Sequence, residues 1–155
     1  MKKNNFEEVK KIFTAYLEQN AHRKTPERYS ILETIYNYDG HFDAEELYIK
    51  MRNQKFRVSR ATVYNTLELL LACNLVTKHQ FGNAQAKFER SYGFKQHDHI
   101  ICTDCNKVFE FCDPRIQETQ NMVEEMMGFK VSHHSLNLYA QCTKEKCEHR
   151  PKQNQ

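Results

Sequence analysis

The chain has 155 residues, enough for one compact domain or two small ones, and a core of fewer than about 80 residues is marginal without a metal or another staple. It contains no run of roughly 18 apolar residues and no basic-then-apolar leader, so we expect a cytoplasmic protein that neither spans nor crosses a membrane. The net charge of +3 is too small to indicate nucleic-acid binding by itself.

The first part of the chain shows the pattern of successive helices. Residues 6–20 form a predicted first helix, and Thr25 followed by Pro26 predicts the start of a second. Asp43 followed by Glu46 has the spacing of a capping box, which predicts a third helix.

A fourth helix is predicted after Ser59, with an apolar stripe formed by Val63, Leu67, Leu70 and Leu71. Two short strand-like runs, Leu75–Gln80 and Gln85–Glu89, follow it and flank a Gly82-Asn83 turn. Helices closed by a hairpin predict a winged helix-turn-helix over residues 1–90.

The basic residues are concentrated in this first part. Residues 1–90 contain 15 Lys and Arg against 11 Asp and Glu, whereas residues 91–155 contain 8 against 9. A basic face that contacts only water explains such a distribution about as well as a nucleic-acid surface, and charge alone leaves both open.

A polar segment, 91–96, predicts a hinge, and a second unit is expected over residues 97–147, with a flexible tail at 148–155. Its predicted strands are His99–Cys102, Lys107–Phe111 and Phe129–Tyr139. Its predicted helix is Pro114–Met127, with Ile116, Val123 and Met126 facing inward. The predicted class is therefore α+β.

Two cysteine pairs, Cys102 with Cys105 and Cys142 with Cys147, have the spacing of a structural zinc site with four thiolates. A redox CxxC would leave the second pair unexplained, and disulfides require an oxidising compartment. Because 36 residues separate the pairs, zinc binding is expected to contribute to folding of the second unit. Cys73 and Cys112 are expected to be structural residues.

His97 and His99 flank Asp98 just before the first cysteine pair. Alternation along a strand places both imidazoles on one side, where they can share a metal. Taken alone, the triplet is more typical of a polar surface.

The chain resembles the ferric uptake regulator family along nearly all of its length. The motifs that carry this resemblance, in family order, are Thr25-Pro26-Glu27-Arg28, Ala44-Glu45-Glu46-Leu47-Tyr48, Ala61-Thr62-Val63-Tyr64, His97-Asp98-His99 and both cysteine pairs. The resemblance implies an N-terminal winged helix joined by a hinge to a C-terminal α/β dimerisation domain.

The resemblance also implies a regulatory metal site, for which the corresponding residues here are His41, Glu89, His97, His99 and Glu110. Imidazole and carboxylate ligands suit Fe(II), with Zn(II) or Mn(II) as possible substitutes. Ligands drawn from both domains would fix their relative angle when metal binds.

A further metal site in some members has four ligands, and the match here is incomplete. Asp98 and His134 are present, but Gln96 and Gln117 stand where His and Glu are expected. This third site is therefore expected to be weak or absent. Two neighbours are candidate substitutes, His133 and Glu118.

The fourth helix is expected to enter the DNA major groove with its first residues nearest the bases. The predicted DNA-binding residues are Arg23, Arg57, Ser59, Arg60, Tyr64 and Asn65. Lys24, Arg28 and Arg57 are expected to hold phosphates, and the resemblance implies that Arg23 reaches the minor groove. The resemblance implies a homodimer, or a higher oligomer, on double-stranded DNA with an inverted-repeat operator.

The leading hypothesis is a Fe(II)-responsive repressor of iron uptake genes. Zinc-, manganese- or peroxide-sensing relatives are the alternatives within the family, and Glu89 and Glu110 favour iron over the peroxide branch, which tends to have Asp there. A zinc hydrolase is not expected, because no HExxH or comparable set is present. A zinc-stabilised protein-interaction module without DNA binding remains the alternative from another class.

Overall fold

Three helices of the first part begin at the predicted caps. Thr25 and Ser59 each accept a hydrogen bond from the backbone amide three residues further on. Asp43 and Glu46 form the full capping box, each carboxylate accepting from the other residue's amide, at 2.8 and 2.7 Å. These contacts satisfy amides that a helix start leaves without partners, and the three predicted caps are confirmed.

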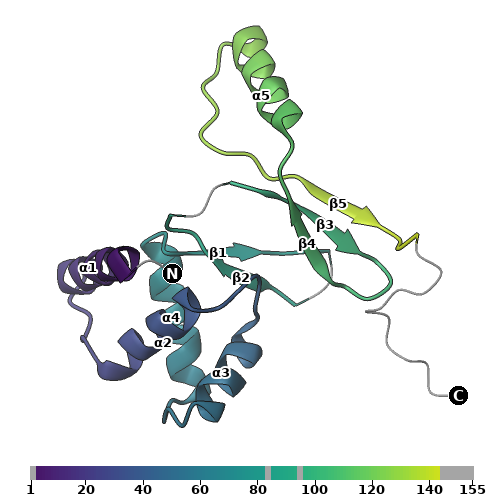
Figure 1. The fold of residues 1–155 in the computed structure, drawn as a ribbon. Helices are drawn as coiled ribbons and strands as arrows, with labels where there is room; N and C mark the ends of the chain where they lie inside the picture. Colours follow the sequence, from purple (N-terminus) through teal and green to yellow (C-terminus); the bar gives the residue numbers. More distant parts are fainter. Residues whose placement is uncertain (1–2, 83–84, 94–95, 144–155) are drawn as a thin grey trace, which may run out of the picture. The chain divides into compact units, whose positions relative to one another are not determined.

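The computed structural model describes residues 3–82, 85–93 and 96–143. Its contacts divide the chain into two units, Met1–Phe94 and Lys95–Gln155, and Figure 1 labels their elements. The boundary falls within the predicted hinge of residues 91–96. The predicted tail, Cys147 and Asn83 of the predicted turn lie outside the described residues. No helix within the described ranges is long and apolar enough to cross a membrane.

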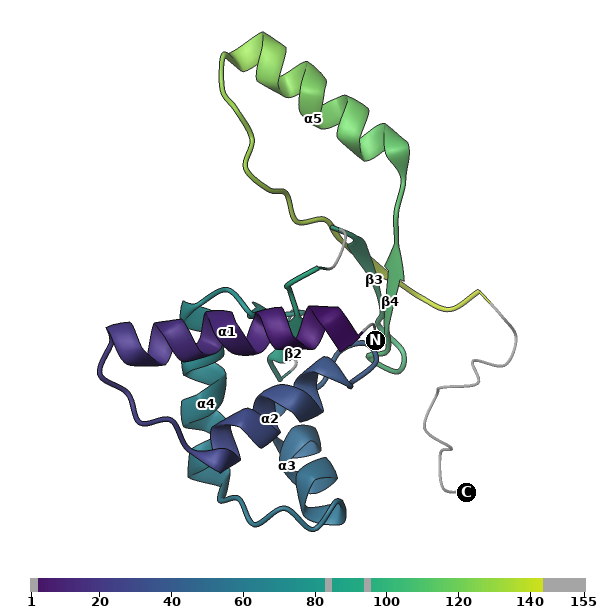
Figure 2. The same cartoon turned by 60° about the vertical axis from the view of Figure 1, so that its left-hand side comes forward.

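Unit 1 is a helical domain with a small hairpin. Its elements are α1 (Lys3–Gln19), α2 (Pro26–Tyr36), α3 (Ala44–Asn53), α4 (Arg60–Ala72), β1 (Val76–His79) and β2 (Lys87–Arg90). Figure 2 shows α1 lying along α2, and side chains from all four helices meet in one apolar core. The largest fully buried members include Phe13, Leu17, Leu32, Tyr36, Leu47, Leu67 and Leu70.

The hairpin is joined to the helices through one isolated bridge. β1 and β2 pair antiparallel, with Thr77 opposite Glu89. Phe42, just before α3, exchanges two backbone hydrogen bonds with Phe88 of β2, at 3.0 and 2.7 Å. The predicted winged helix-turn-helix is therefore confirmed.

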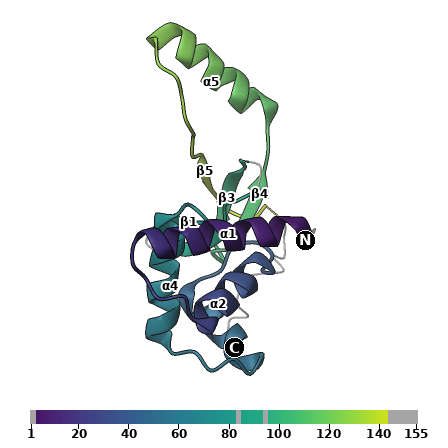
Figure 3. The same ribbon diagram turned by 90° about the vertical axis from the view of Figure 1, so that its left-hand side faces the viewer.

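Unit 2 is built on a three-stranded sheet. Its strands are β3 (Asp98–Cys102), β4 (Val108–Phe111) and β5 (Asn137–Ala140), and its helix is α5 (Pro114–Met127). β3 is central, antiparallel to β4 and parallel to β5. In both Figure 1 and Figure 3, α5 stands off these strands on two extended connections.

Two predictions for unit 2 are wrong. The strand expected at Phe129–Tyr139 is paired only from Asn137, because the preceding segment forms the return connection from α5. The apolar stripe of α5 does not face inward: the helix has no buried residue, and Val123 and Met126 are 43% and 74% exposed. Among the described residues of one chain, no apolar surface covers this stripe, although its pattern is that of a packed helix face.

Candidate metal centres and nucleic-acid interface

The first cysteine pair lies in a tight turn between β3 and β4. Cys102 is the last residue of β3, and its carbonyl accepts a hydrogen bond of 2.8 Å from the amide of Asn106, whose φ of 58° closes the turn. The backbone amide of Asp104 holds the pKa of the Cys102 thiol below its ordinary value, since it donates to the sulfur. A turn that stabilises a thiolate is suited to a metal ligand.

The chain returns to this turn through β5. Ala140 is the parallel partner of Cys102, and its carbonyl accepts a 2.9 Å hydrogen bond from Thr103. Two residues later the amide of Cys142 lies 3.3 Å from a carboxylate oxygen of Asp104. Three of the four predicted thiolates thus come from the same end of the sheet; the fourth, Cys147, lies outside the described residues.

Two predicted ligands of the regulatory site meet in unit 1. The bridge between Phe42 and Phe88 brings the preceding His41 beside the following Glu89, because antiparallel pairing aligns neighbours on either side of a bridge. His41 Nε2 lies 3.3 Å from Glu89 Oε2. An imidazole and a carboxylate oxygen are therefore available to one cation on this unit.

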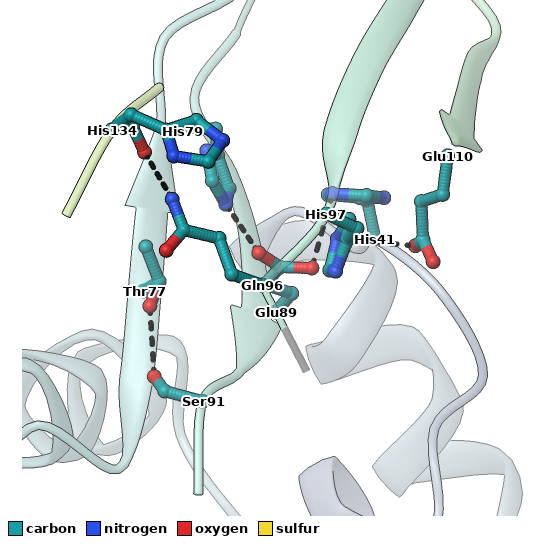
Figure 4. A network of polar contacts seen from close by, with 9 residues as sticks. All are labelled: His41, Thr77, His79, Glu89, Ser91, Gln96, His97, Glu110 and His134. Carbon is teal, nitrogen blue, oxygen red and sulfur yellow. Dashed lines mark hydrogen bonds and ion pairs between the residues drawn. The ribbon is translucent and has the colours of Figure 1, made fainter. Parts of the chain in front are cut away.

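His79 belongs to the same group of side chains and was not predicted as a site residue. Its Nε2 lies 2.6 Å from Glu89 Oε1, and its ring is 5.5 Å from that of His41 (Figure 4). The sequence places His79 on a predicted strand, but only the register of the hairpin shows that it reaches Glu89. That register depends on the conformation of the turn between the strands, which the sequence alone does not determine.

Unit 2 contains the other three predicted ligands. The rings of His97 and His99 are 4.9 Å apart, as expected for side chains on the same side of a strand. Glu110 is the antiparallel partner of His99, and its carboxylate lies 3.8 Å from His97 Nε2. The five predicted ligands are thus divided into two groups, two on unit 1 and three on unit 2.

Asp98 and His134, the remnant of the predicted third site, are in direct contact. His134 Nε2 lies 3.2 Å from Asp98 Oδ1, and His134 Nδ1 lies 3.0 Å from the side-chain oxygen of Gln120. Gln96 donates to the His134 carbonyl at 2.7 Å (Figure 4), and Gln117 donates to Asn121. Both glutamines therefore engage protein acceptors. The candidate substitutes do not join this contact: His133 contacts Ser132, and within the described residues Glu118 forms no hydrogen bond or ion pair with Asp98 or His134.

Several predicted DNA-binding residues line one cleft of unit 1. The cleft, about 510 Å³ in volume, lies where α2 and α4 begin. Both helix starts supply the partial positive charge that attracts phosphate. Its polar lining includes Arg23, Arg28, Arg57, Ser59 and Asn65.

Arg60 and Tyr64 do not line this cleft. Arg60 donates two hydrogen bonds to Glu45, and its guanidinium lies 4.4 Å from the centre of the Tyr48 ring. Tyr64 is 48% exposed, so packing in the core does not explain it. Lys24 is paired with Glu18 at 2.5 Å. The predicted DNA-binding set is thus divided between a cleft and the outer face of α4.

Comparison with known proteins agrees with these features. The pattern of the Ferric uptake regulator family matches residues 19–139. The ferric uptake regulation protein of Cupriavidus metallidurans is 36% identical over 131 residues, covering 84% of this chain and 91% of that protein. The peroxide operon regulator of Bacillus subtilis is 34% identical over 126 residues, covering 81% and 86%.

A solved structure gives the same result. The ferric uptake regulator of Helicobacter pylori, whose structure reveals three functional metal binding sites, superposes with a TM-score of 0.79 at 25% identity. The match covers 89% of this chain and 91% of that one. Unit 1 is accordingly the winged-helix domain of the family, and unit 2 the dimerisation domain. The chain belongs to the ferric uptake regulator family, whose members are dimeric, metal-responsive, DNA-binding transcription regulators and not enzymes.

Proposed function

We propose that this chain is a Fe(II)-responsive repressor of iron uptake genes. The observation that carries the proposal is the pairing of imidazoles with carboxylates on both units: His41 with Glu89, and His97 and His99 with Glu110. Nitrogen and oxygen donors of this kind suit Fe(II), and the set lacks the thiolates that would favour softer ions.

In this proposal the two groups bind one regulatory metal. A cation that takes ligands from both units favours the arrangement in which all of them reach it, and its differential affinity sets how far the equilibrium shifts. The predicted hinge at 91–96 joins a DNA-binding domain at 1–90 to a dimerisation domain at 97–147. Two of the proposed ligands belong to the first domain and three to the second. Metal occupancy would thereby set the spacing of two winged helices.

Structural zinc is assigned to Cys102, Cys105, Cys142 and Cys147. The assignment is supported by the return of β5 to the turn that holds the first pair. It is also supported by the Asp104 amide, whose hydrogen bond lowers the pKa of the Cys102 thiol. When bound, zinc supplies a tetrahedral cross-link between two segments that are far apart in sequence.

DNA binding is assigned to the cleft and to the exposed face of α4. Arg57 and Arg28 would hold phosphates, and Arg23 would reach the minor groove. Asn65 and Tyr64 would reach base edges in the major groove. The apolar stripe of α5 is the proposed dimer surface, and a two-fold dimer matches an inverted-repeat operator.

The test is duplex binding with and without metal. Duplexes are selected from a random pool by the zinc-containing protein with Fe(II) under anaerobic conditions. Binding of the selected duplex is then measured without added metal and with Fe(II), Mn(II) or Zn(II). We expect Fe(II) to tighten binding at least tenfold, and His97→Ala to remove that response while the protein stays folded. Binding that no metal affects would defeat the proposal, and a response to Zn(II) or Mn(II) alone would reassign the metal.

A further inference from the structure

His79 holds one oxygen of Glu89, while the other oxygen faces His41. The short contact is on Oε1, at 2.6 Å from His79 Nε2, and the longer one is on Oε2, at 3.3 Å from His41 Nε2. Figure 4 shows the Glu89 carboxylate between these side chains. A carboxylate with one oxygen occupied by a hydrogen bond presents the other in a defined direction.

The position of His79 follows from the hairpin. Thr77 is the antiparallel partner of Glu89 and His79 that of Lys87, so His79 is the diagonal neighbour of Glu89 on the same face. The hydroxyls of Thr77 and Ser91 are in contact at 2.8 Å, which ties the strands on the other side of Glu89. The Glu89 carboxylate therefore has His79 on one side along the hairpin and the Thr77–Ser91 contact on the other.

The ring of His79 is itself oriented by packing. It stacks on the ring of Phe81, with centres 5.4 Å apart and planes within 3°. The His41 ring meets both of these rings edge-on, at 5.5 and 5.8 Å. This packing fixes which ring edge of His79 faces Glu89.

We propose that His79 is a positioning residue for the regulatory metal: it donates its Nε2 proton to Glu89 Oε1 and so directs Oε2 toward the cation that His41 shares. This inference rests on the proposed metal site. Outer partners that orient a ligand typically change metal affinity by about 10- to 100-fold when removed. A cross-strand pair with only a structural role would instead change stability and leave affinity unaltered.

The experiment compares two substitutions of His79 in the full-length, zinc-containing protein. Co(II) is the probe, and its visible absorption is titrated anaerobically; the signal that His41→Ala abolishes defines the regulatory site. His79→Phe removes the donor, whereas His79→Gln keeps an N–H at similar reach but is a poor metal ligand. Lys78→Gln, on the opposite face of β1, is the matched control. Zinc content and thermal unfolding verify that each variant is folded, and His79→Leu replaces His79→Phe if the latter is not.

The expected result is a loss of Co(II) affinity of at least tenfold in His79→Phe, recovery to within about threefold in His79→Gln, and no change in Lys78→Gln. Wild-type affinity in His79→Phe would overturn the inference. Equal losses in both His79 variants would also overturn it, because His79 would then be a direct ligand. If His41→Ala abolished no part of the Co(II) absorption of the wild type, the proposed metal site would itself be wrong.

Discussion

The guanidinium of Arg60 lies in a fork against the carboxylate of Glu45. Nε and Nη2 donate hydrogen bonds of 2.9 and 2.7 Å, and these two residues join the starts of α4 and α3. The Arg60 side-chain hydrogen bonds lower the pKa of the Glu45 carboxyl, which keeps the acid ionised. A basic residue of the predicted DNA-binding set is thus neutralised by its own domain.

Glu45→Gln is therefore expected to strengthen duplex binding. With the acid removed, Arg60 becomes available to one more phosphate, and the slope of log affinity against log salt should steepen by about 0.9. Fluorescence anisotropy across a KCl series measures both quantities. Glu7→Gln, an exposed change on α1, is the control. A second substitution, Arg60→Ala, should return the slope to its original value; an unaltered slope in Glu45→Gln would show that Arg60 never reaches DNA.

Local features of the fold could be predicted from the sequence, whereas features that depend on distant pairing could not. The caps at Thr25, Asp43 and Ser59 involve residues within three positions, and each was found. The contact of His79 with Glu89 depends on hairpin register, and that of Arg60 with Glu45 on helix packing. The spacing of the motifs along the sequence predicts neither of these two contacts.

The same distinction explains the errors in unit 2. The apolar periodicity of α5 was correctly found, but periodicity does not specify whether the covering surface belongs to the same chain. The run after Phe129 has strand-like composition yet acts as a connection, because only its end reaches β3. Whether a segment of this composition forms a strand or a connection thus depends on whether another strand pairs with it.

Cys142→Ser is expected to release zinc and unfold unit 2 while leaving the core of unit 1 intact. Cys142 reaches the turn at Cys102 only through β5, so losing the cross-link frees that strand. Metal analysis gives zinc content, and amide hydrogen exchange reports each unit separately. Cys112→Ser, at an exposed cysteine outside the predicted set, is the matched control and should retain zinc. Retention of zinc and protection in Cys142→Ser would remove Cys142 from the ligand set.

Met126→Glu is expected to convert the dimer to a monomer. Met126 is 74% exposed on the apolar stripe of α5, and a buried, unpaired carboxylate in an apolar interface is strongly unfavourable. Sedimentation equilibrium measures the dissociation constant, which should rise at least a hundredfold. Asn121→Glu adds the same charge on the opposite side of the helix, by its spacing of five residues from Met126, and should leave the constant unchanged. Equal effects of the two changes would place the interface elsewhere.

Asp43 is expected to give unit 1 a pH-dependent contribution to stability. Burial alone would raise the pKa of this carboxyl, but hydrogen bonds from the Glu46 amide and from Lys87, at 3.0 Å, outweigh it and lower the pKa. A lowered pKa in the folded state means that the contribution is fully present above the unfolded pKa of about 3.9 and is lost as the pH falls through the folded value.

Two substitutions separate the cap from the charge. Asp43→Asn keeps a good cap but loses the ion pair with Lys87, and should cost about 1 kcal/mol at pH 7. Asp43→Ala loses both and should cost about 2 kcal/mol. Urea unfolding, monitored by the circular dichroism of the helices at pH 7 and below pH 3, measures the free energy of unfolding of each variant relative to wild type. Because acid would release zinc from both proteins, that effect cancels in the difference. The Asn variant should approach wild-type stability as the pH falls and Asp43 becomes protonated, whereas the Ala variant should remain less stable. A deficit of Asp43→Asn that did not shrink on acidification would mean that the charge of Asp43 contributes nothing.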